Sequence, residues 1–406
     1  VLFMFMRAMG EMLLSNLGFK SFADIAHKHI GPLAGFVVGW TYWLTWIISG
    51  MAEITAVAKY IEYWYPAMPN WLTALFTLLV LMTLNLFSAK LFGELEFWFA
   101  IIKVLTILAL IIVGIIMIVF AMKTPYGTAS VSQIWSHGGI FPHGASGFFM
   151  SFQMAIFSFI GIELIGITAG ETKNPHKTIP QAINNVPYRI LIFYIGSLAV
   201  IMAAVPWNQL NPSDSPYVKL FGLIGIPFAA GLINFVVLTA AASACNSGVF
   251  ANSRTMFGLS QRKQAPPILG KTNRNGVPYY AILVTCALLS ISVILNAIFK
   301  DATQVFVYIT TVSTVLNIVI WSIIMIAYLG YLKHNPELHK ASQYKMPGGK
   351  WMAYAIVLFF IFIFVVLLIN PSTRLAVIIA PFWMGILGLM YLRYKKESRK
   401  AEIPDE

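Results

Sequence analysis

The chain has 406 residues, of which 59% are hydrophobic and only 10% are charged, and its mean hydropathy is +0.78. Soluble domains carry about 25% charged residues, so the composition excludes a soluble fold and indicates an integral membrane protein surrounded by lipid. The net charge of +12 would suit a nucleic-acid partner, but the basic residues lie in short loops between apolar segments and form no continuous patch, which excludes nucleic acid.

Ten apolar runs are long enough to cross a bilayer as helices. They lie at 36–64, 71–88, 97–121, 146–170, 188–206, 226–258, 279–299, 303–332, 351–369 and 374–394. An eleventh run, Val1–Leu14, is shorter than the ~20 residues that a span needs. The chain also begins with Val rather than Met. We therefore expect the first run to begin in mid-membrane, with the preceding helix missing.

The basic residues predict the orientation. If the loop after Leu14 is cytoplasmic and the spans alternate, the outer loops hold only Lys123, Lys219, Lys300 and Arg374. Most other lysines and arginines then lie in cytoplasmic loops and in the tail, as the positive-inside rule requires. We expect a multi-pass protein whose C-terminal tail, residues 395–406, is cytoplasmic.

The loops at 122–145, 171–187, 259–278 and 333–350 are too short to hold a soluble domain, so we expect one membrane domain spanning residues 1–406. Cys245 and Cys286 lie in separate apolar runs, without disulfide or metal spacing. We find no nucleophile triad, phosphate-binding loop or zinc motif. The sequence therefore predicts no enzyme, no metal site and no cofactor.

Lys103 is an ionisable residue deep inside a predicted span, in "ELEFWFAIIKVLTILALIIVG". It follows Glu94 by nine residues, which corresponds to a depth of ~14 Å in the bilayer. Charged groups at this depth cost ~2.5–3.5 kcal/mol. One interpretation is a snorkelling or structurally paired lysine. The others are a desolvated amine that releases and rebinds a proton, and a fixed cation standing where a relative would bind sodium.

Glu163 lies in "FSFIGIELIGITAGETKNP", among Gly161, Gly166 and Gly170. Glycines weaken the helix on both sides of the carboxylate. Glu163 would either cap backbone that the glycines loosen, or mark a discontinuous helix whose unwound backbone binds a polar ligand. Glu53 lies in another predicted span and is less informative.

Small and hydroxyl residues recur from Leu238 to Ser260, a pattern typical of close helix packing. Ser243, Asn246 and Ser247 could in addition face a polar cavity. Arg254 would either close a cytoplasmic gate with Glu171 or anchor the helix at the membrane surface.

Several long segments resemble the bacterial amino-acid transporter family of the amino acid–polyamine–organocation permeases. They are "RAMGEM" (Arg7–Met12), "SFADIAHKHIGPLAGFVVGWTYW" (Ser21–Trp43), "NLFSAKLFGELEFWFAIIKV" (Asn85–Val104), "FSFIGIELIGITAGETKNPHKTIPQAIN" (Phe157–Asn184) and "INFVVLTAAASACNSGVFANSR" (Ile233–Arg254). Within that family, Val305–Met352 is most similar to the D-serine/D-alanine/glycine permeases.

The resemblance implies an all-α integral membrane protein with a LeuT-like inverted-repeat fold of twelve helices. Residues 1–332 would be helices 2–10 of the core, and residues 351–394 would be two additional helices. About eleven helices would be present, the first one only in part. Family members bind the substrate carboxylate at a glycine-rich break in helix 1, and this chain has no such segment.

The resemblance also assigns roles to residues. Lys103 falls on helix 5, where related permeases carry a lysine tied to proton coupling. The broken part of helix 6, which lines the substrate site, would comprise Phe157, Ser158, Phe159, Gly161, Ile162 and Glu163.

The expected function is proton symport of small neutral amino acids, namely D-alanine, D-serine and glycine, across the bacterial cytoplasmic membrane. The expected partners are the amino acid, protons and the lipid bilayer, and the oligomeric state stays open. The alternatives are an exchanger, a permease for an L-amino acid or 4-aminobutyrate, and a membrane receptor that binds an amino acid without transport. A channel is disfavoured because no charged ring or filter-like repeat occurs.

Overall fold

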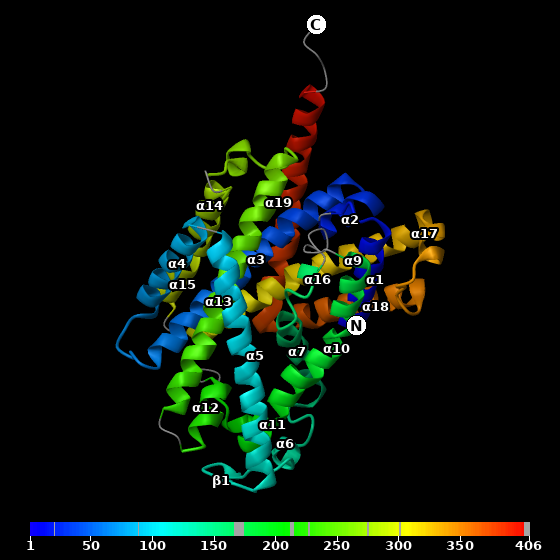
Figure 1. Ribbon diagram of the computed structural model, residues 1–406. Coiled ribbons are helices and arrows are strands. Elements are labelled where there is room, and N and C mark those ends of the chain that lie inside the picture. Colours follow the sequence, from blue (N-terminus) through cyan, green and yellow to red (C-terminus); the bar gives the residue numbers. More distant parts are fainter. Residues whose placement is uncertain are drawn as a thin grey trace.

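The computed structural model describes the backbone of residues 1–19, 21–87, 89–165, 174–211, 215–225, 228–273, 276–299 and 302–401. It describes the side chains of all these residues except 87, 89–96, 302, 372 and 396–401. The described part is mainly helical, and its only sheet is a two-stranded hairpin (Figure 1). The C-terminal helix projects from one end of the molecule, and the hairpin lies at the opposite end.

The first half of the chain consists of α1 (Leu2–Ser15), α2 (Phe22–His29), α3 (Pro32–Glu62), α4 (Asn70–Phe87), α5 (Ala89–Val119), β1 (Lys123–Thr124), β2 (Gly127–Thr128), α6 (Gln133–Ser136) and α7 (Gly144–Phe157). The next described elements are α9 (Pro175–Asn184), α10 (Val186–Arg189), the π-helix η2 (Ile190–Gly196), α11 (Ser197–Ala204), the 3₁₀-helix η3 (Trp207–Gln209), α12 (Pro216–Gly222) and α13 (Ala229–Gln261). The last are the 3₁₀-helix η4 (Pro267–Gly270), α14 (Tyr279–Leu289), α15 (Ile291–Ile298), α16 (Ala302–His334), α17 (Pro336–Ala341), α18 (Gly349–Ile369) and α19 (Pro371–Ala401).

The apolar runs form helices, as the sequence predicts. In the described ranges, eight helical stretches are long and apolar enough to cross a membrane. They are Pro32–Glu62, Phe97–Val119, Pro175–Ala204, Ala229–Gln261, Tyr279–Ile298, Thr303–His334, Gly349–Ile369 and Thr373–Lys395. Two shorter apolar helices are Asn70–Leu86, which corresponds to the predicted span 71–88, and Gly144–Phe157, which covers only the first part of the predicted span 146–170. The structure therefore confirms an all-α architecture with many candidate membrane spans.

Two predicted boundaries are wrong. The predicted span 146–170 is not one helix, because α7 ends at Phe157. The predicted loop 171–187 contains α9, so that helical structure runs from Pro175 to Ala204. Proline is tolerated in the first turn of a helix, where its missing N–H has no partner to lose, and Pro175 therefore begins α9 instead of preventing it.

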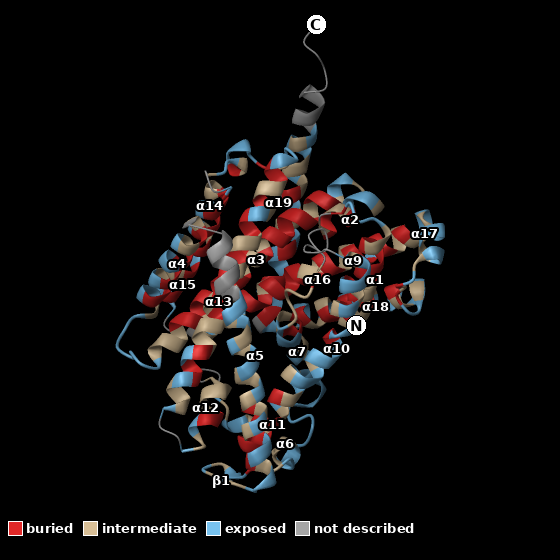
Figure 2. Cartoon of the chain, in the orientation of Figure 1, coloured by how far each residue is buried: buried red, intermediate tan, exposed pale blue. Residues whose placement is uncertain are grey.

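The centre of the molecule is formed by α3, which packs against both α13 and α16. Buried residues concentrate on these helices (Figure 2). Interhelical hydrogen bonds join them to one another and to their neighbours. One runs between the Ser49 and Ser313 hydroxyls at 2.6 Å, and another from Asn296 to Thr55 at 2.9 Å. Such bonds contribute on average about 0.6 kcal/mol each in a membrane, so packing supplies most of the stability.

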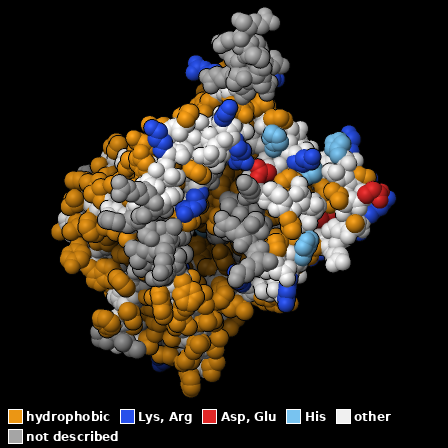
Figure 3. Space-filling model, turned by 45° about the horizontal axis from the view of Figure 1, so that its top comes forward, with side chains coloured by type: hydrophobic (Ala, Val, Ile, Leu, Met, Phe, Trp, Pro, Cys, Tyr) orange, Lys and Arg blue, Asp and Glu red, His pale blue; other side chains and the backbone are white. Residues whose placement is uncertain are grey.

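The outer helices expose large apolar side chains. On α5, Leu105, Ile112 and Val119 are each more than half exposed, and α18 and α19 do the same with Leu358 and Phe382. One face of the molecule is largely hydrophobic, whereas the visible lysines and arginines gather toward the end that carries the C terminus (Figure 3). The hydrophobic face suits contact with lipid chains.

The fully buried carboxylate of Glu11 holds α1 in place. It accepts hydrogen bonds from the Tyr328 hydroxyl of α16 at 2.8 Å and from the backbone N–H of Met346 at 2.9 Å. It also pairs with His339 Nδ1 of α17 at 2.5 Å. One carboxylate of α1 thus fixes α16 and the connection that follows it.

Arg7, one turn earlier on α1, binds the same connection and α9. Its guanidinium donates to the Lys345 carbonyl oxygen and to Asn184 Oδ1, and it lies 3.8 Å from the centre of the Tyr344 ring. Burial raises the pKa of the Tyr344 hydroxyl, so this group stays protonated and donates to Asn184 Oδ1 at 3.1 Å. The "RAMGEM" segment therefore anchors the N-terminal helix to both α9 and the 335–348 connection.

Candidate functional site

The helix break after α7 is the central feature of the site. The chain leaves the helix after Phe157, forms turns through residues 158–163, and is helical again at Leu164 and Ile165. Gly161 adopts a φ of +101°, which side chains other than glycine rarely tolerate. The glycine that the sequence places beside Glu163 therefore breaks the helix as predicted.

Glu163 stabilises this break from the inside. Its carboxylate is fully buried, and both oxygens accept the backbone N–H of Gly161, at 3.1 and 3.2 Å. A carboxylate accepting a backbone N–H is a strong, charge-assisted hydrogen bond. The structure therefore shows both a helix break and a Glu163 carboxylate that caps it, and ligand binding by the unwound backbone stays a prediction.

Aromatic residues of other helices support the unwound segment. The hydroxyl of Tyr194, from η2, donates to the Ser158 carbonyl oxygen at 3.0 Å. The same Tyr194 ring stacks on Phe159 with a centroid distance of 5.1 Å. On the other side, Phe157 contacts Phe306 of α16 edge to face. The break is thus fixed at three successive residues.

A cavity of about 580 Å³ lies against the break. Its walls come from α1, α3, α5, the break itself, the α10–η2 helix and α13. They comprise Met6, Trp46, Ser49, Gly50, Glu53, Lys103, Phe157, Ser158, Phe159, Ile160, Gly161, Ile162, Leu164, Ile165, Val186, Arg189, Ile190, Tyr194, Ala244 and Ser247. This volume and mostly apolar lining with a few polar groups are typical of small-molecule sites.

Opposite charges from two helices meet in this cavity. Lys103 of α5 and Glu53 of α3 both line it. The Lys103 ammonium also donates to the buried Ser243 hydroxyl of α13 at 3.0 Å. The structure therefore places Lys103 at the junction of three helices rather than at the lipid surface, where a snorkelling lysine would lie.

The other residues singled out in the sequence have different surroundings in the structure. Ser247 lines the cavity, Ser243 holds Lys103, and Asn246 accepts a hydrogen bond from Asn85 of α4 at 2.7 Å. Gly161 and Ile162 line the cavity, whereas Glu163 is not among its lining residues.

Arg254 lies on α13, with its guanidinium 3.2 Å from the centre of the Phe250 ring. The proposed gate partner Glu171 is outside the described residues, so the gate stays a prediction.

Trp46 and Ser49 are cavity residues that the sequence analysis does not single out, and Glu53 is a cavity residue that it names only as less informative. Glu53 is nevertheless an ionisable residue inside an apolar helix of 31 residues, the same signal that marks Lys103. Trp46 and Ser49 carried no such signal, since aromatic and hydroxyl residues are frequent in α3.

Comparison with known proteins identifies the family. The amino acid permease family model matches residues 1–404. The chain is 46% identical to the D-serine/D-alanine/glycine transporter of Escherichia coli K12, over 99% of this chain and 86% of that protein. It is 47% identical to amino-acid permease AapA of Bacillus subtilis 168, over 98% of this chain and 86% of that protein. It is 39% identical to the aromatic amino acid transport protein AroP of Escherichia coli O6:H1 over 99% and 87%.

Both the family match and these relatives cover nearly the whole chain, and the named relatives are transporters or permeases. The chain therefore belongs to the amino acid permease family, as an all-α, multi-pass membrane transporter of amino acids rather than an enzyme.

Proposed function

We propose that this protein imports D-alanine, D-serine and glycine together with a proton, across the bacterial cytoplasmic membrane and with its C terminus in the cytoplasm. The observation that carries the proposal is the shared cavity, in which the helix break of residues 158–163 faces Glu53 and Lys103. The 46% identity to the D-serine/D-alanine/glycine transporter supports the choice of substrates.

The break supplies the substrate contacts in this proposal. Backbone groups that leave a helix present donors and acceptors to a ligand at membrane depth, where water is scarce. The ammonium of the amino acid would bind backbone carbonyl oxygens between Ser158 and Ile162. Phe157, Phe159 and Trp46 would enclose the small side chain of the substrate.

The Glu53–Lys103 pair supplies the proton site in this proposal. A carboxylate and an ammonium in one desolvated cavity can exchange a proton at low cost, because transfer between them neutralises both charges. One proton moving through 100 mV supplies about 2.3 kcal/mol, which supports roughly 50-fold accumulation of a neutral amino acid. Substrate and proton together would favour the inward-facing state.

Replacing Lys103 with Met tests the proton site. We expect Lys103→Met to lose accumulation of labelled D-alanine driven by a proton gradient, because the variant has no ammonium to exchange the proton. It should retain at least part of the exchange of internal for external D-alanine, which needs no net proton entry. Both activities are measured in proteoliposomes.

Lys350→Met is the matched control, since it removes the same charge from an exposed lysine outside the cavity. It should accumulate D-alanine like the unmodified protein. Full gradient-driven accumulation by Lys103→Met would contradict the assignment.

The second candidate function is exchange, or transport of a different amino acid. The names of AapA and AroP show that similar chains include permeases not named for D-serine, D-alanine or glycine. An exchanger would take up labelled amino acid only into vesicles preloaded with amino acid. Uptake into empty vesicles would exclude it.

A further inference from the structure

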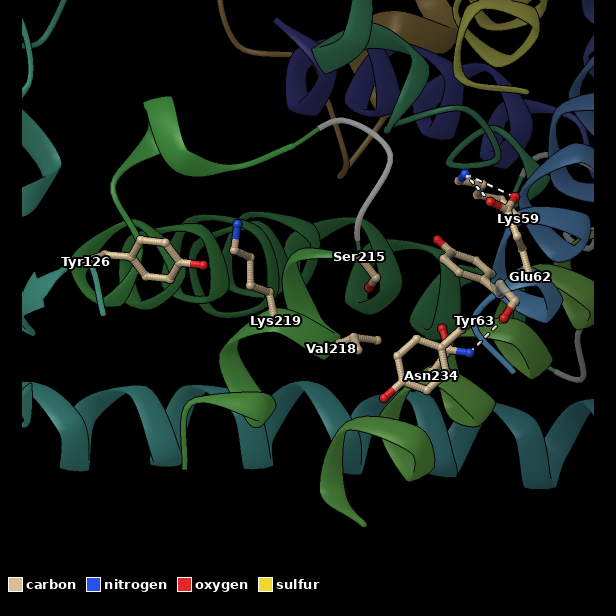
Figure 4. A pocket seen from close by; sticks show the side chains of 9 residues that line it. Lys59, Glu62, Tyr63, Tyr126, Ser215, Val218, Lys219 and Asn234 are labelled. Atoms are coloured by element: carbon tan, nitrogen blue, oxygen red, sulfur yellow. Dashed lines mark hydrogen bonds and ion pairs between the residues drawn. The ribbon is translucent and has the colours of Figure 1, made fainter. Parts of the chain in front are cut away.

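A second cavity, of about 350 Å³, lies at the end of the molecule that carries β1 and α12 (Figures 1 and 4). It is lined by Lys59, Tyr60, Glu62, Tyr63, Tyr126, Ser215, Val218, Lys219 and Asn234. These residues come from the last turn of α3 and the start of the segment after it, the hairpin, α12 and the first turns of α13. None of them lines the central cavity.

The charges of this outer cavity do not cancel. The Lys59 ammonium lies 3.0 Å from both Glu62 oxygens, so these two groups neutralise each other. Lys219 forms no ion pair with any carboxylate that the structure describes. Its ammonium donates to the Gln209 carbonyl oxygen and lies 4.9 Å from the centre of the Tyr126 ring. Among the described residues that line the cavity, the ammonium of Lys219 is therefore the cation available to an anionic ligand.

The opposite wall favours a cation. Tyr60, in the last turn of α3, and Tyr63, just after that helix, also line the cavity, and Tyr63 lies across it from Lys219 in Figure 4. Aromatic faces attract an ammonium group. Asn234 of α13 fixes this wall by donating to the Tyr60 carbonyl oxygen at 2.8 Å. One side of the cavity therefore favours an anionic group and the other side favours a cationic group, as the two ends of a zwitterion require.

The same two helices lead from this cavity to the central one. Lys59 follows Glu53 by six residues on α3, which corresponds to ~9 Å along the helix axis. On α13, Asn234 precedes Ala244, which lines the central cavity, by ten residues or ~15 Å. A ligand in the outer cavity is therefore two to three helical turns from the substrate cavity.

We infer that the outer cavity is a second binding site for amino-acid zwitterions, with the carboxylate on Lys219 and the ammonium toward the rings of Tyr60 and Tyr63. It holds an incoming amino acid before the molecule reaches the central cavity. That the ligand is also the transported amino acid rests on the proposed function. The binding itself is tested without transport.

The test labels a cysteine placed in the outer cavity. Val218→Cys introduces a half-buried thiol there, and both native cysteines, Cys245 and Cys286, are buried. The rate of its reaction with a sulfonate-bearing methanethiosulfonate reagent is measured in detergent. We expect saturating glycine to slow labelling at least about threefold. Acetate should slow it less, and methylammonium should not slow it.

Two further substitutions in the Val218→Cys background decide the role of Lys219. Lys219→Gln should lower the basal labelling rate and abolish the effect of glycine. Lys123→Gln removes the same charge from β1, outside the cavity, and should leave protection by glycine intact. Labelling that glycine does not slow would overturn the inference, as would equal protection in Lys219→Gln.

These outcomes are distinguishable from failure of the proposed function. Protection by glycine that depends on Lys219 would support the outer site even if no uptake of D-alanine occurs. Gradient-driven uptake without such protection would support the proposed transport function and contradict the outer binding site.

Discussion

Glu11→Ala is expected to lower the free energy of unfolding by about 2–6 kcal/mol, because two buried donors that lose their acceptor cost about 1–3 kcal/mol each. The Glu11 carboxylate is fully buried and pairs with three groups, on Tyr328, His339 and Met346. Its loss leaves the Tyr328 hydroxyl and the Met346 N–H unsatisfied in the interior. Unfolding in mixed micelles with increasing denaturing detergent measures the change.

Glu337→Ala is the matched control for this prediction. Glu337 lies on α17 and pairs with Lys340 at 3.0 Å, but both side chains are more than 70% exposed. Exposed ion pairs contribute roughly 0–1 kcal/mol, so this variant should unfold like the unmodified protein. Similar losses in the two variants would mean that burial of the Glu11 carboxylate is not what anchors α1.

Gly161→Leu should abolish amino-acid binding while leaving membrane insertion intact. A Cβ at Gly161 would meet only the Leu164 side chain, at 3.9 Å, so crowding by that atom is not the cause. The loss of binding comes instead from backbone strain. A leucine held at the Gly161 φ of +101° costs about 1–3 kcal/mol in conformational free energy, so the backbone would shift to avoid it. The shift would move the cavity wall and the N–H that Glu163 accepts. Binding of labelled D-alanine should weaken at least about 100-fold.

Gly385→Leu makes the same change at an exposed helical glycine of α19, where a Cβ has open space. It should bind D-alanine normally. Both variants should be recovered from the membrane fraction in similar amounts. Unchanged affinity in Gly161→Leu would mean that the helix break does not form the substrate site.

The sequence could predict the helices and the break because both depend on local properties. Continuous apolar runs mark the helices, and a glycine beside a carboxylate inside such a run marks the break at Gly161. Lys103 was identifiable because a charge at membrane depth is costly.

The remaining features depend on contacts between distant segments. Glu53 and Lys103 meet only because α3 and α5 line one cavity, and Glu11 meets His339 across 328 positions of the chain. No local pattern specifies such pairs. The start of α9 was missed for a different reason: Pro175 is compatible both with a loop and with the first turn of a helix.

We propose that the protein imports D-alanine, D-serine and glycine together with a proton. The most direct test is uptake of labelled D-alanine into amino-acid-free proteoliposomes, with and without an imposed inward proton gradient. We predict uptake that the gradient increases and that glycine and D-serine block, whereas L-alanine and 4-aminobutyrate compete weakly. Uptake that does not respond to the gradient would contradict proton symport, and transport of a different amino acid without D-alanine would contradict the substrate assignment.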